Sequence, residues 1–492
     1  MTLTVLVFLP LAAGLIQALL PRPLNKWFAA SASIGVLGYS IVLLANYPAA
    51  GGGLKWVVDK MWIKELGIHY SLGVDGLNVF LILLTTILWT AATLAAALRD
   101  WDRSRTFFFH MALAETAVLG AFVAQDVALF VFFFDLMLVP FYFLIGTWGG
   151  TRRVEATTKF VIYTLVGSLL MLAAAVALGV LSAKGGQPIS FDLKDLTQRT
   201  LSSGDQYWIF LLFALAFLVK MPAFPLHGWM PDAYRACPLP VLVLLSGVLS
   251  KVGAYGFLRI VLPTMPQGSA HFQELMIVIA VVSILYGSVL AFSQDEARLV
   301  AGYSSIAQLG FITLGIFSLD PKGAQGAVFQ MLNHGLVMGP LFLIVGVLAL
   351  RARGTEQLSR WGGLAVRAPV LAALFLIVAL ATLAMPGSAN FMGELYILFG
   401  IFSTKLAYGI VATIGVVLAS VYMIRFYQRA MHNRPGPDVE SREITRWEFG
   451  LVAPLVAVII ALGFYPNFVL SRSESSTVSK LPAHQTPNVA TK

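Results

Sequence analysis

The stretch FALAFLVKMPAFPLHGWMPDA, residues 213–233, decides how the rest of the chain is interpreted. It begins as an apolar run of the kind that crosses a membrane, yet Lys220 lies inside the run and Pro222 follows two residues later. A charged side chain is costly inside a bilayer, and a proline removes the hydrogen bond that the carbonyl of Leu218 would otherwise accept. A free carbonyl at that depth is tolerated only where protein or water satisfies it, so the break predicts a polar pocket around Lys220.

The composition is that of a polytopic α-helical membrane protein. The chain has 492 residues, of which 58% are hydrophobic and only 12% are charged. Apolar runs of about 20 residues, the length that crosses a bilayer, recur from end to end. The roughly ten-residue alternating segments of a membrane β-barrel are absent. The first apolar run, 3–20, has no basic start and no cleavage site, so we expect it to remain as the first helix.

The same composition excludes several kinds of site. The single cysteine, Cys237, excludes a disulfide framework, a cysteine-ligated iron–sulfur cluster and a CxxC redox pair within this chain. No glycine-rich phosphate-binding motif is present, and we expect no metal site. The net charge of +9 is explained by the positive-inside bias of membrane proteins rather than by a nucleic-acid partner.

The pattern of apolar runs predicts about fourteen spans, which places both termini on one side of the membrane. The loops after odd-numbered spans carry 19 Lys and Arg residues and the opposite side carries 12. We therefore expect a multi-pass protein of a bacterial cell (plasma) membrane, with the basic loops in the cytoplasm and both termini outside. The expected spans are 3–20, 28–46, 77–98, 107–124, 127–147, 160–182, 207–227, 239–263, 272–293, 300–319, 323–350, 368–403, 406–428 and 447–469.

Two Met-Pro pairs indicate an internal repeat. The pairs at 221–222 and 385–386 each interrupt an apolar run beside an ionisable residue, and each falls in the fourth helix of a five-helix unit. Paired broken helices are typical of inverted-repeat transporters. We therefore expect an all-α fold with two inverted repeats and broken seventh and twelfth helices. Its expected segments are a three-helix segment 1–106, the repeats 107–263 (helices 4–8) and 272–428 (helices 9–13), a last helix within 429–471, and a disordered polar tail 472–492.

Five ionisable residues lie well inside predicted spans. An aspartate or lysine at a helix centre costs about 2.5–3.5 kcal/mol, so several such residues in one chain are expected to face each other or a wet cavity. The alternative is a set of static ion pairs between helices, although small residues would pack helices together at lower cost. The five residues are Asp135, Lys220, Lys251, His334 and Glu394.

A row of such groups can carry protons. Burial disfavours the charged form of a lysine and a carboxylate neighbour favours it again, so a partner that moves makes the lysine take up and release a proton. Asp135 is the expected partner of Lys220, and Glu394 is the expected terminal site. Gln330, Asn333 and His334 share one helix face, which favours a proton-relay role for the histidine over a buried structural role.

The roles of two other titratable residues stay open. Glu115, in the fourth span, is either functional or structural, and His227, just past the first break, is either an entry-side relay or a cap. Four charged residues near span ends are expected to meet solvent or headgroups, namely Asp75, Asp126, Asp232 and Arg259.

Eight motifs in this order along the chain resemble the antiporter-like proton-pumping subunits of respiratory complex I, the NADH-quinone oxidoreductase. The resemblance runs from about residue 70 to 430. The motifs are LGVDGLNVFLILLT, VFFFDLMLVPFYFLIGTWGG, KFVIYTLVGSLLML, FLVKMPAFPLHGWMPDA, SKVGAYGFLR, AGYSSIAQLGF, QMLNHGL and MPGSANFMGELYIL.

The resemblance implies a fourteen-helix fold with inverted repeats and a proton path over the same five residues. It also implies that this chain holds no redox cofactor and that flavin and iron–sulfur clusters lie in partner subunits. The glutamate at position 394 makes the chain similar to the subunit M (chain 4) branch of the family, because related branches usually have lysine at this position. Two departures stand out: Asp135 replaces the usual glutamate, and Ala297 replaces a lysine often found before Arg298.

We therefore expect a proton-translocating membrane subunit of an NADH-quinone oxidoreductase. It would work with other membrane and peripheral subunits in the lipid bilayer, as a non-redox part of the H⁺-translocating enzyme. The alternatives are a subunit of a multisubunit cation/proton antiporter or membrane-bound hydrogenase, which reuse this fold, and a scaffold subunit that pumps nothing.

Overall fold

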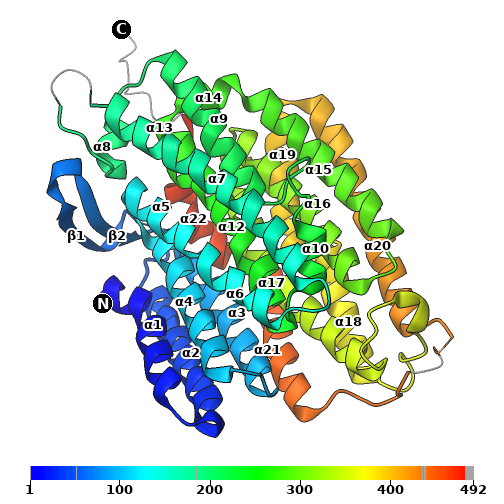
Figure 1. Cartoon of the computed structure of the whole chain (residues 1–492). Helices are drawn as coiled ribbons and strands as arrows, with labels where there is room; N and C mark the ends of the chain where they lie inside the picture. The colour runs from blue at the N-terminus through cyan, green and yellow to red at the C-terminus, as the bar shows by residue number, and fades with distance from the viewer. Residues whose placement is uncertain (1, 51, 184–186, 435, 437–438, 483–492) are drawn as a thin grey trace.

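Long apolar helices make up most of the chain (Figure 1). The computed structural model describes residues 2–482 apart from 51, 184–186, 435, 437 and 438. Within these residues, twelve helices are long and apolar enough to cross a membrane, and α1 (Leu3–Leu19) and α18 (Pro369–Thr382) are shorter apolar helices. The predicted polytopic helical fold is confirmed, whereas the count of fourteen spans and the inverted repeats remain predictions.

The helices follow the predicted spans closely, and several predicted spans consist of two or more pieces. The remaining helices are α2 (Arg22–Ala45), α3 (Val79–Ala97), α4 (Ser104–Val123), α5 (Val127–Leu136), α6 (Leu138–Trp148), α7 (Arg153–Leu181), α8 (Leu193–Gln198), α9 (Ser203–Lys220), α10 (Met230–Ala236), α11 (Leu239–Leu244), α12 (Ser250–Gly256), α13 (Leu262–Thr264), α14 (Pro266–His271), α15 (Gln273–Ser293), α16 (Ala297–Phe317), α17 (Pro321–Arg351), α19 (Ala389–Thr404), α20 (Leu406–Met431), α21 (Arg446–Phe464) and α22 (Asn467–Val478).

Both predicted helix breaks are present. Helix α9 ends at Lys220 and α10 begins at Met230, while α18 ends at Thr382 and α19 begins at Ala389. The eighth predicted span has an irregularity that the sequence did not predict, because π-helical turns at Leu245–Leu249 and Phe257–Val261 flank α12. Such π turns recur at functional sites.

A β-hairpin is a correction to the expected all-α fold. Strands β1 (Lys55–Ile63) and β2 (Ile68–Val74) pair antiparallel beside the N-terminal end of α1. Gly67 joins them with φ 63°, a left-handed conformation that glycine adopts without strain. The strand sequence KWVVDKMWI is rich in β-branched and aromatic residues, which was the available signal for it.

Asp126 connects the hairpin to the bundle. It is buried, whereas the sequence predicted that it would meet solvent or headgroups. It is fully buried at the N-terminus of α5, where its two carboxylate oxygens accept hydrogen bonds from the backbone N–H groups of His69 and Leu129, both at 3.0 Å. Burial raises the pKa of Asp126 to about 6, although these hydrogen bonds oppose the shift.

The raised pKa of Asp126 predicts a pH-dependent stability. Because the folded carboxyl binds its proton more tightly than the unfolded one, its contribution is present at low pH and is lost as pH rises from about 4 through about 6. The variant Asp126→Asn is expected to lack this part of the pH dependence, which amounts to about 3 kcal/mol at most. Thermal unfolding of the detergent-solubilised protein between pH 4.5 and 7.5 tests this, and identical slopes for both proteins would contradict it.

The segment after the last predicted span folds onto the bundle. The expectation of disorder from residue 472 is wrong for residues 472–482, since α22 continues to Val478 and its Ser473, Ser476 and Thr477 are buried. Ser476 Oγ accepts a hydrogen bond from Gly76 N at 3.0 Å, which holds α22 beside the end of β2. Hydroxyls that bond backbone groups explain why a polar sequence can pack here. Residues 483–492 lie outside the described residues.

The two ends of the bundle differ in character. We call the end with β1–β2, α8 and α22 the hairpin face, and both ends of the described chain lie there, since Tyr70 Oη donates to Thr4 Oγ1 and Gly76 bonds Ser476. At the opposite end, the arginine-rich face, ion pairs tie loops together. These are Arg235–Glu296 at 2.8 Å, Arg298–Glu356 at 2.6 Å and Arg351–Glu448 at 2.9 Å.

Candidate functional site

The first helix break is satisfied by its own residues. The carbonyl of Leu218 was expected to be free, but it is hydrogen-bonded. The chain turns back after Pro222, and the N–H of Ala223 donates to this carbonyl at 3.0 Å. The carbonyl of Val219 accepts a hydrogen bond from the indole Nε1 of Trp229 at 2.9 Å. The break therefore forms a closed turn with Lys220 at the end of α9, where the helix dipole favours a positive charge.

Lys220 lies between an aromatic ring and a carboxylate of α5. Its side chain is buried, and Nζ lies 4.5 Å from the centroid of the Phe134 ring. Asp135 interacts electrostatically with Lys220 and lies beside Ser168 of α7. The two charges form no contact ion pair within 4.0 Å, and Oδ1 of Asp135 has no protein hydrogen-bond partner. Asp135 and Lys220 therefore lie near each other without forming a contact ion pair, and their partnership stays a prediction.

The short side chain at position 135 predicts a graded response to substitution. Asp135→Glu, which restores the usual family residue, is expected to keep proton pumping within about twofold, because the longer carboxylate reaches further towards Lys220. Asp135→Asn removes the charge at constant size and is expected to lower pumping about tenfold, a loss of about 1.4 kcal/mol. Acidification of vesicles that contain the assembled complex measures both. Equal pumping by Asp135→Asn and wild type would show that this carboxylate is not needed.

Lys251 is fully buried in the middle of the bundle. The π turn that directly precedes it places the carbonyl of Ser246 within reach, and Lys251 Nζ donates to it at 2.8 Å and to Ser250 Oγ at 3.2 Å. Ser246 Oγ in turn lies 3.3 Å from Ser305 Oγ of α16. Lys251 also interacts electrostatically with His334 of α17.

The polar stripe of α17 connects Lys251 with the second break. His334 is 1% exposed and neither ring nitrogen has a hydrogen-bond partner within the protein. Asn333 Nδ2 donates to the carbonyl of Ala389, the first residue of α19, at 3.0 Å. Gln330 Nε2 donates to Gln308 Oε1 of α16 at 2.7 Å. The stripe therefore faces both the first half of the chain and the broken helix of the second half.

Glu394 lies at the end of this chain of contacts. Its carboxylate accepts a hydrogen bond from Gln308 Nε2 at 2.7 Å, so a continuous path of side chains runs from Gln330 through Gln308 to Glu394. Tyr422 of α20 interacts with Glu394 electrostatically, and its buried hydroxyl has no protein partner.

The second break is rich in unpaired polar atoms. Pro386 has no N–H to offer the carbonyl of Thr382, and no backbone N–H among the described residues reaches it. The side chains of Ser388 and Asn390 also carry buried polar atoms without protein partners. The second break is therefore less completely hydrogen-bonded within the protein than the first.

The two auxiliary candidates lie apart from the row. Glu115 is buried in α4 beside a small cavity whose walls come from α1, α2, α3 and α4, so it does not face Lys220 of α9. His227 lies in the first break, where Nε2 is 3.1 Å from the hydroxyl of Tyr286 of α15. Their roles remain predictions. Within the described residues, no group of three or more His, Cys, Asp or Glu residues is arranged to hold a metal ion.

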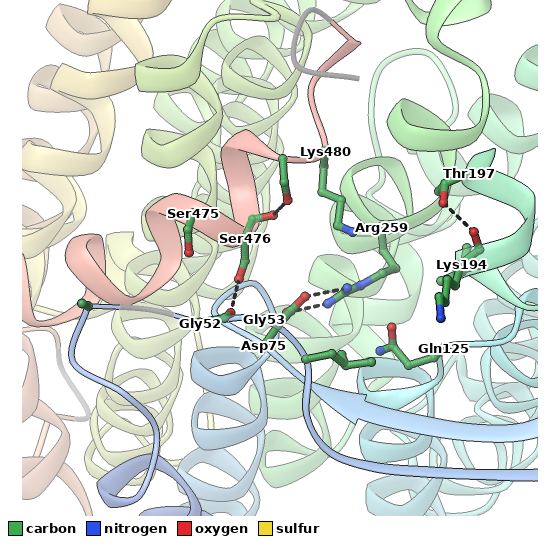
Figure 2. A pocket seen from close by; sticks show the side chains of 14 residues that line it. Gly52, Gly53, Asp75, Gln125, Lys194, Thr197, Arg259, Ser475, Ser476 and Lys480 are labelled. Atoms are coloured by element: carbon green, nitrogen blue, oxygen red, sulfur yellow. Dashed lines mark hydrogen bonds and ion pairs between the residues drawn. The ribbon is translucent and has the colours of Figure 1, made fainter. Parts of the chain in front are cut away.

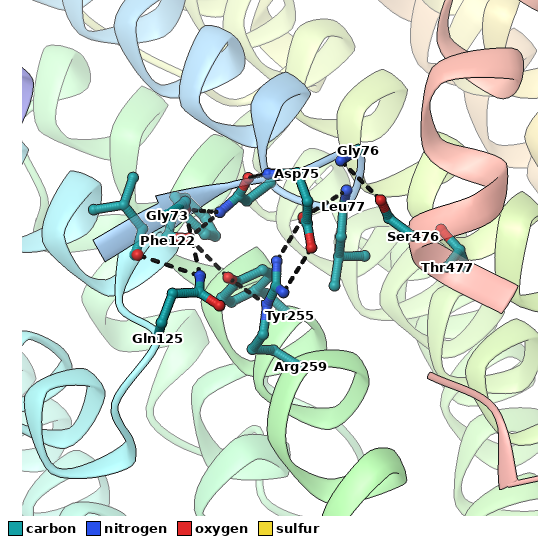
Figure 3. A network of polar contacts seen from close by, with 12 residues as sticks. Gly73, Asp75, Gly76, Leu77, Phe122, Gln125, Tyr255, Arg259, Ser476 and Thr477 are labelled. Atoms are coloured by element: carbon teal, nitrogen blue, oxygen red, sulfur yellow. Dashed lines mark hydrogen bonds and ion pairs between the residues drawn. The ribbon is translucent and has the colours of Figure 1, made fainter. Parts of the chain in front are cut away.

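Sequence reasoning missed three features of this interior. Gln308 is hydrogen-bonded to Glu394 and Tyr422 interacts with it electrostatically, and the signal for Gln308 was an amide inside the apolar run 300–319. Asp75 and Arg259 were expected to meet solvent, but they form a buried ion pair at 2.7 Å (Figure 3). This pair closes the end of the bundle at the hairpin face.

Comparisons with known proteins agree with the geometry. Residues 124–419 match the family model described as NADH:quinone oxidoreductase/Mrp antiporter, TM. The chain is 37% identical to NADH-quinone oxidoreductase subunit M of Rhodobacter capsulatus over 95% of this chain and 94% of the relative. It is 38% identical to the Escherichia coli K12 subunit M over 89% of this chain and 87% of the relative.

A solved structure shares the whole fold. A chain of respiratory complex I from Thermus thermophilus with bound NADH superposes with a TM-score of 0.88 and 30% identity, covering 97% of this chain and 100% of that chain. The family model covers more than half of this chain, and the relatives exceed 30% identity over nearly their whole length. The chain therefore belongs to the antiporter-like membrane subunits of NADH-quinone oxidoreductase, in the subunit M family.

Proposed function

We propose that this chain is a proton-translocating membrane subunit of a multisubunit NADH-quinone oxidoreductase. The observation that carries the proposal is a set of ionisable residues inside the bundle, on helices near the two helix breaks. Asp135 interacts with Lys220, Lys251 interacts with His334, and Glu394 is hydrogen-bonded to Gln308. Ionisable groups inside a membrane are costly, and a series of them is typical of a proton relay.

Each member of the row has a distinct task in this account. Lys220 takes up a proton when the Asp135 carboxylate approaches and releases it when the carboxylate moves away. Lys251 accepts it, and His334, whose two ring nitrogens can hold and pass a proton, connects Lys251 to the second half. Glu394 is the terminal acceptor, held in place by Gln308. Moving one charge against 100 mV requires about 2.3 kcal/mol, which a change in one ion-pair partner can supply.

The redox chemistry belongs to other subunits in this proposal. The flavin and iron–sulfur clusters lie in partner chains, and quinone reduction there drives charge movement along the row. This chain is a non-redox part of the enzyme in the bacterial plasma membrane. The hairpin face, which carries both ends of the described chain, points outside, and the arginine-rich face points to the cytoplasm, in keeping with the positive-inside bias.

Mild detergent extraction of the tagged chain from its native membrane tests the assignment. We expect flavin and iron–sulfur absorbance to co-purify with NADH:quinone activity. Co-purification with hydrophobic antiporter-like chains and no chromophore, together with Na⁺-dependent transport, would instead identify a cation/proton antiporter. Wild-type pumping by an assembled Lys220→Ala complex would favour the scaffold alternative.

A further inference from the structure

A saturated polar network lies at the hairpin-face end of the first half of the chain (Figure 3). The guanidinium nitrogens Nη1 and Nη2 of Arg259 donate to the two carboxylate oxygens of Asp75, both at 2.7 Å. Arg259 Nε donates to the hydroxyl of Tyr255 at 2.8 Å, and that hydroxyl donates to the carbonyl of Phe122 at 2.7 Å. Arg259 is 2% exposed and Asp75 is 5% exposed.

Further hydrogen bonds hold the Asp75 segment in one geometry. Asp75 Oδ1 also accepts from Leu77 N at 3.0 Å, and Asn78 Oδ1 accepts from Asp75 N at 2.9 Å. Asn78 Nδ2 donates to the carbonyls of Gly73 and Phe122, at 3.0 and 2.8 Å. The network thus joins the end of β2, the start of α3, the end of α4 and the π turn after α12.

The chemistry of this network is poorly suited to passing protons. Burial alone would raise the pKa of Asp75, but the Arg259 guanidinium holds it below its ordinary value, so the carboxylate stays ionised. An arginine does not give up its proton in proteins. Both carboxylate oxygens of Asp75 and all three side-chain nitrogens of Arg259 are hydrogen-bonded, which holds the pair in a fixed geometry.

An aromatic layer separates this pair from Lys251. Arg259 is two helical turns beyond Lys251, which corresponds to about 12 Å along the helix. Around Tyr255, the intervening rings pack edge to face: Phe122 lies 5.3 Å from Tyr255, and Phe217 lies 5.2 Å from Phe257 and 6.2 Å from Phe130 between centroids. All five side chains are at most 1% exposed, so this layer is dry.

Solvent reaches the other side of the pair. A cavity of about 680 Å³ at the hairpin face is lined by Asp75, Arg259, Lys194, Ser476 and Lys480, with α22 along one wall (Figure 2). The ion pair is therefore the boundary between this cavity and the aromatic layer above Lys251. The second break, by contrast, contains buried polar atoms of Ser388 and Asn390 that have no partner within the protein.

We propose that the Asp75–Arg259 ion pair, together with Tyr255 and the aromatic layer, forms a seal. The seal prevents protons from passing between Lys251 and the solvent at the hairpin face. A proton on Lys251 then cannot leave along its own helix and passes sideways to His334 and the second half. The direction of this proton path rests on the proposed function. The seal itself does not, because the rate of passive proton leak through the complex measures it directly.

The decisive variant is Arg259→Met in the assembled complex. It leaves the Asp75 carboxylate buried without a partner, and an unpaired buried charge draws in water or a proton. In proteoliposomes with an imposed pH gradient and no NADH, we expect the gradient to decay at least about tenfold faster than with the wild type, a barrier loss of about 1.4 kcal/mol. The double variant Asp75→Leu/Arg259→Met restores a dry apolar contact and is expected to be as tight as the wild type.

Two further variants make the test decisive. Arg351→Met breaks a comparably buried ion pair, with Glu448 on the arginine-rich face, and is expected to lose thermal stability without leaking. Tyr255→Phe removes the hydrogen-bond partner of Arg259 Nε, while the Phe122 carbonyl keeps its hydrogen bond from Asn78. This variant decides the question if Arg259→Met does not assemble. With this variant the pH gradient is expected to decay about threefold faster than with the wild type, or faster still, because about one hydrogen bond is lost.

Two results would overturn the seal. If the assembled Arg259→Met complex holds the pH gradient as long as the wild type does, the pair is purely structural. The same conclusion follows from Tyr255→Phe if Arg259→Met does not assemble. Loss of NADH-driven pumping without any passive leak would place the pair on a proton exit path instead. If the proposed function is wrong, a different experiment shows it: Lys220→Ala would pump as well as the wild type. The passive decay of the pH gradient would not be affected by that outcome.

Discussion

Replacing Lys220 by alanine is expected to lower NADH-driven proton pumping by about 100-fold or more, the usual contribution of a positioned proton-transfer group. The variant removes the buried lysine at the end of α9, directly before the first helix break, and takes away the cation that interacts with Asp135. Quinone reduction coupled to pumping is expected to fall with it. NADH oxidation by a water-soluble acceptor, which bypasses the membrane subunits, is expected to stay unchanged.

Lys322→Ala is the matched control for this variant. Lys322 is an exposed lysine in the first turn of α17, at the hairpin face, and its Nζ lies 6.0 Å from the Phe399 ring. It is expected to pump like the wild type. An assembled Lys220→Ala complex that pumps as well as Lys322→Ala would show that Lys220 only joins helices, as in the static alternative.

The second large effect is expected at Glu394. Glu394→Gln preserves the size of the side chain and an oxygen that can accept the hydrogen bond of Gln308, so the contact at 2.7 Å can persist. The amide cannot carry a proton at neutral pH, and pumping is expected to fall by about 100-fold or more for the same reason as at Lys220. Vesicle acidification on addition of NADH measures the loss.

Glu274→Gln makes the same chemical change at an exposed position. Glu274 lies in the first turn of α15 and accepts a hydrogen bond from the hydroxyl of Tyr408 at 2.8 Å. It is expected to have no effect on pumping. If Glu394→Gln also pumps normally while assembled, the terminal site of the path lies elsewhere, and Glu394 is held by Gln308 for structural reasons alone.

The breaks and the buried charges could be predicted from the sequence because both are local signals. A Met-Pro pair beside an ionisable residue inside an apolar run predicted a helix end, and an ionisable residue inside a span is expected to find a partner or water. These rules identified Lys220 and Glu394, and they grouped Gln330, Asn333 and His334 on one face. The structure connects that face to Glu394 through Gln308.

What the sequence did not reveal depends on residues that are distant along the chain. Asp75 and Arg259 each lie near the end of a predicted span and look solvated one at a time, yet their pairing across 184 positions buries both. The same holds for Asp126, whose partner His69 belongs to an unpredicted hairpin, and for α22, whose serines pack only because backbone groups such as Gly76 N meet them. The carbonyl of Leu218 was expected to be free because the return of the chain to Ala223 could not be foreseen.

The most direct test of the account is the number of protons moved per NADH oxidised, measured in one set of proteoliposomes. The set would hold wild type, Lys220→Ala and Glu394→Gln, with Lys322→Ala and Glu274→Gln as controls. The account predicts that both interior variants assemble and lose proton movement while both surface controls keep it. A wild-type ratio in either assembled interior variant would contradict the claim that protons cross the membrane along this row.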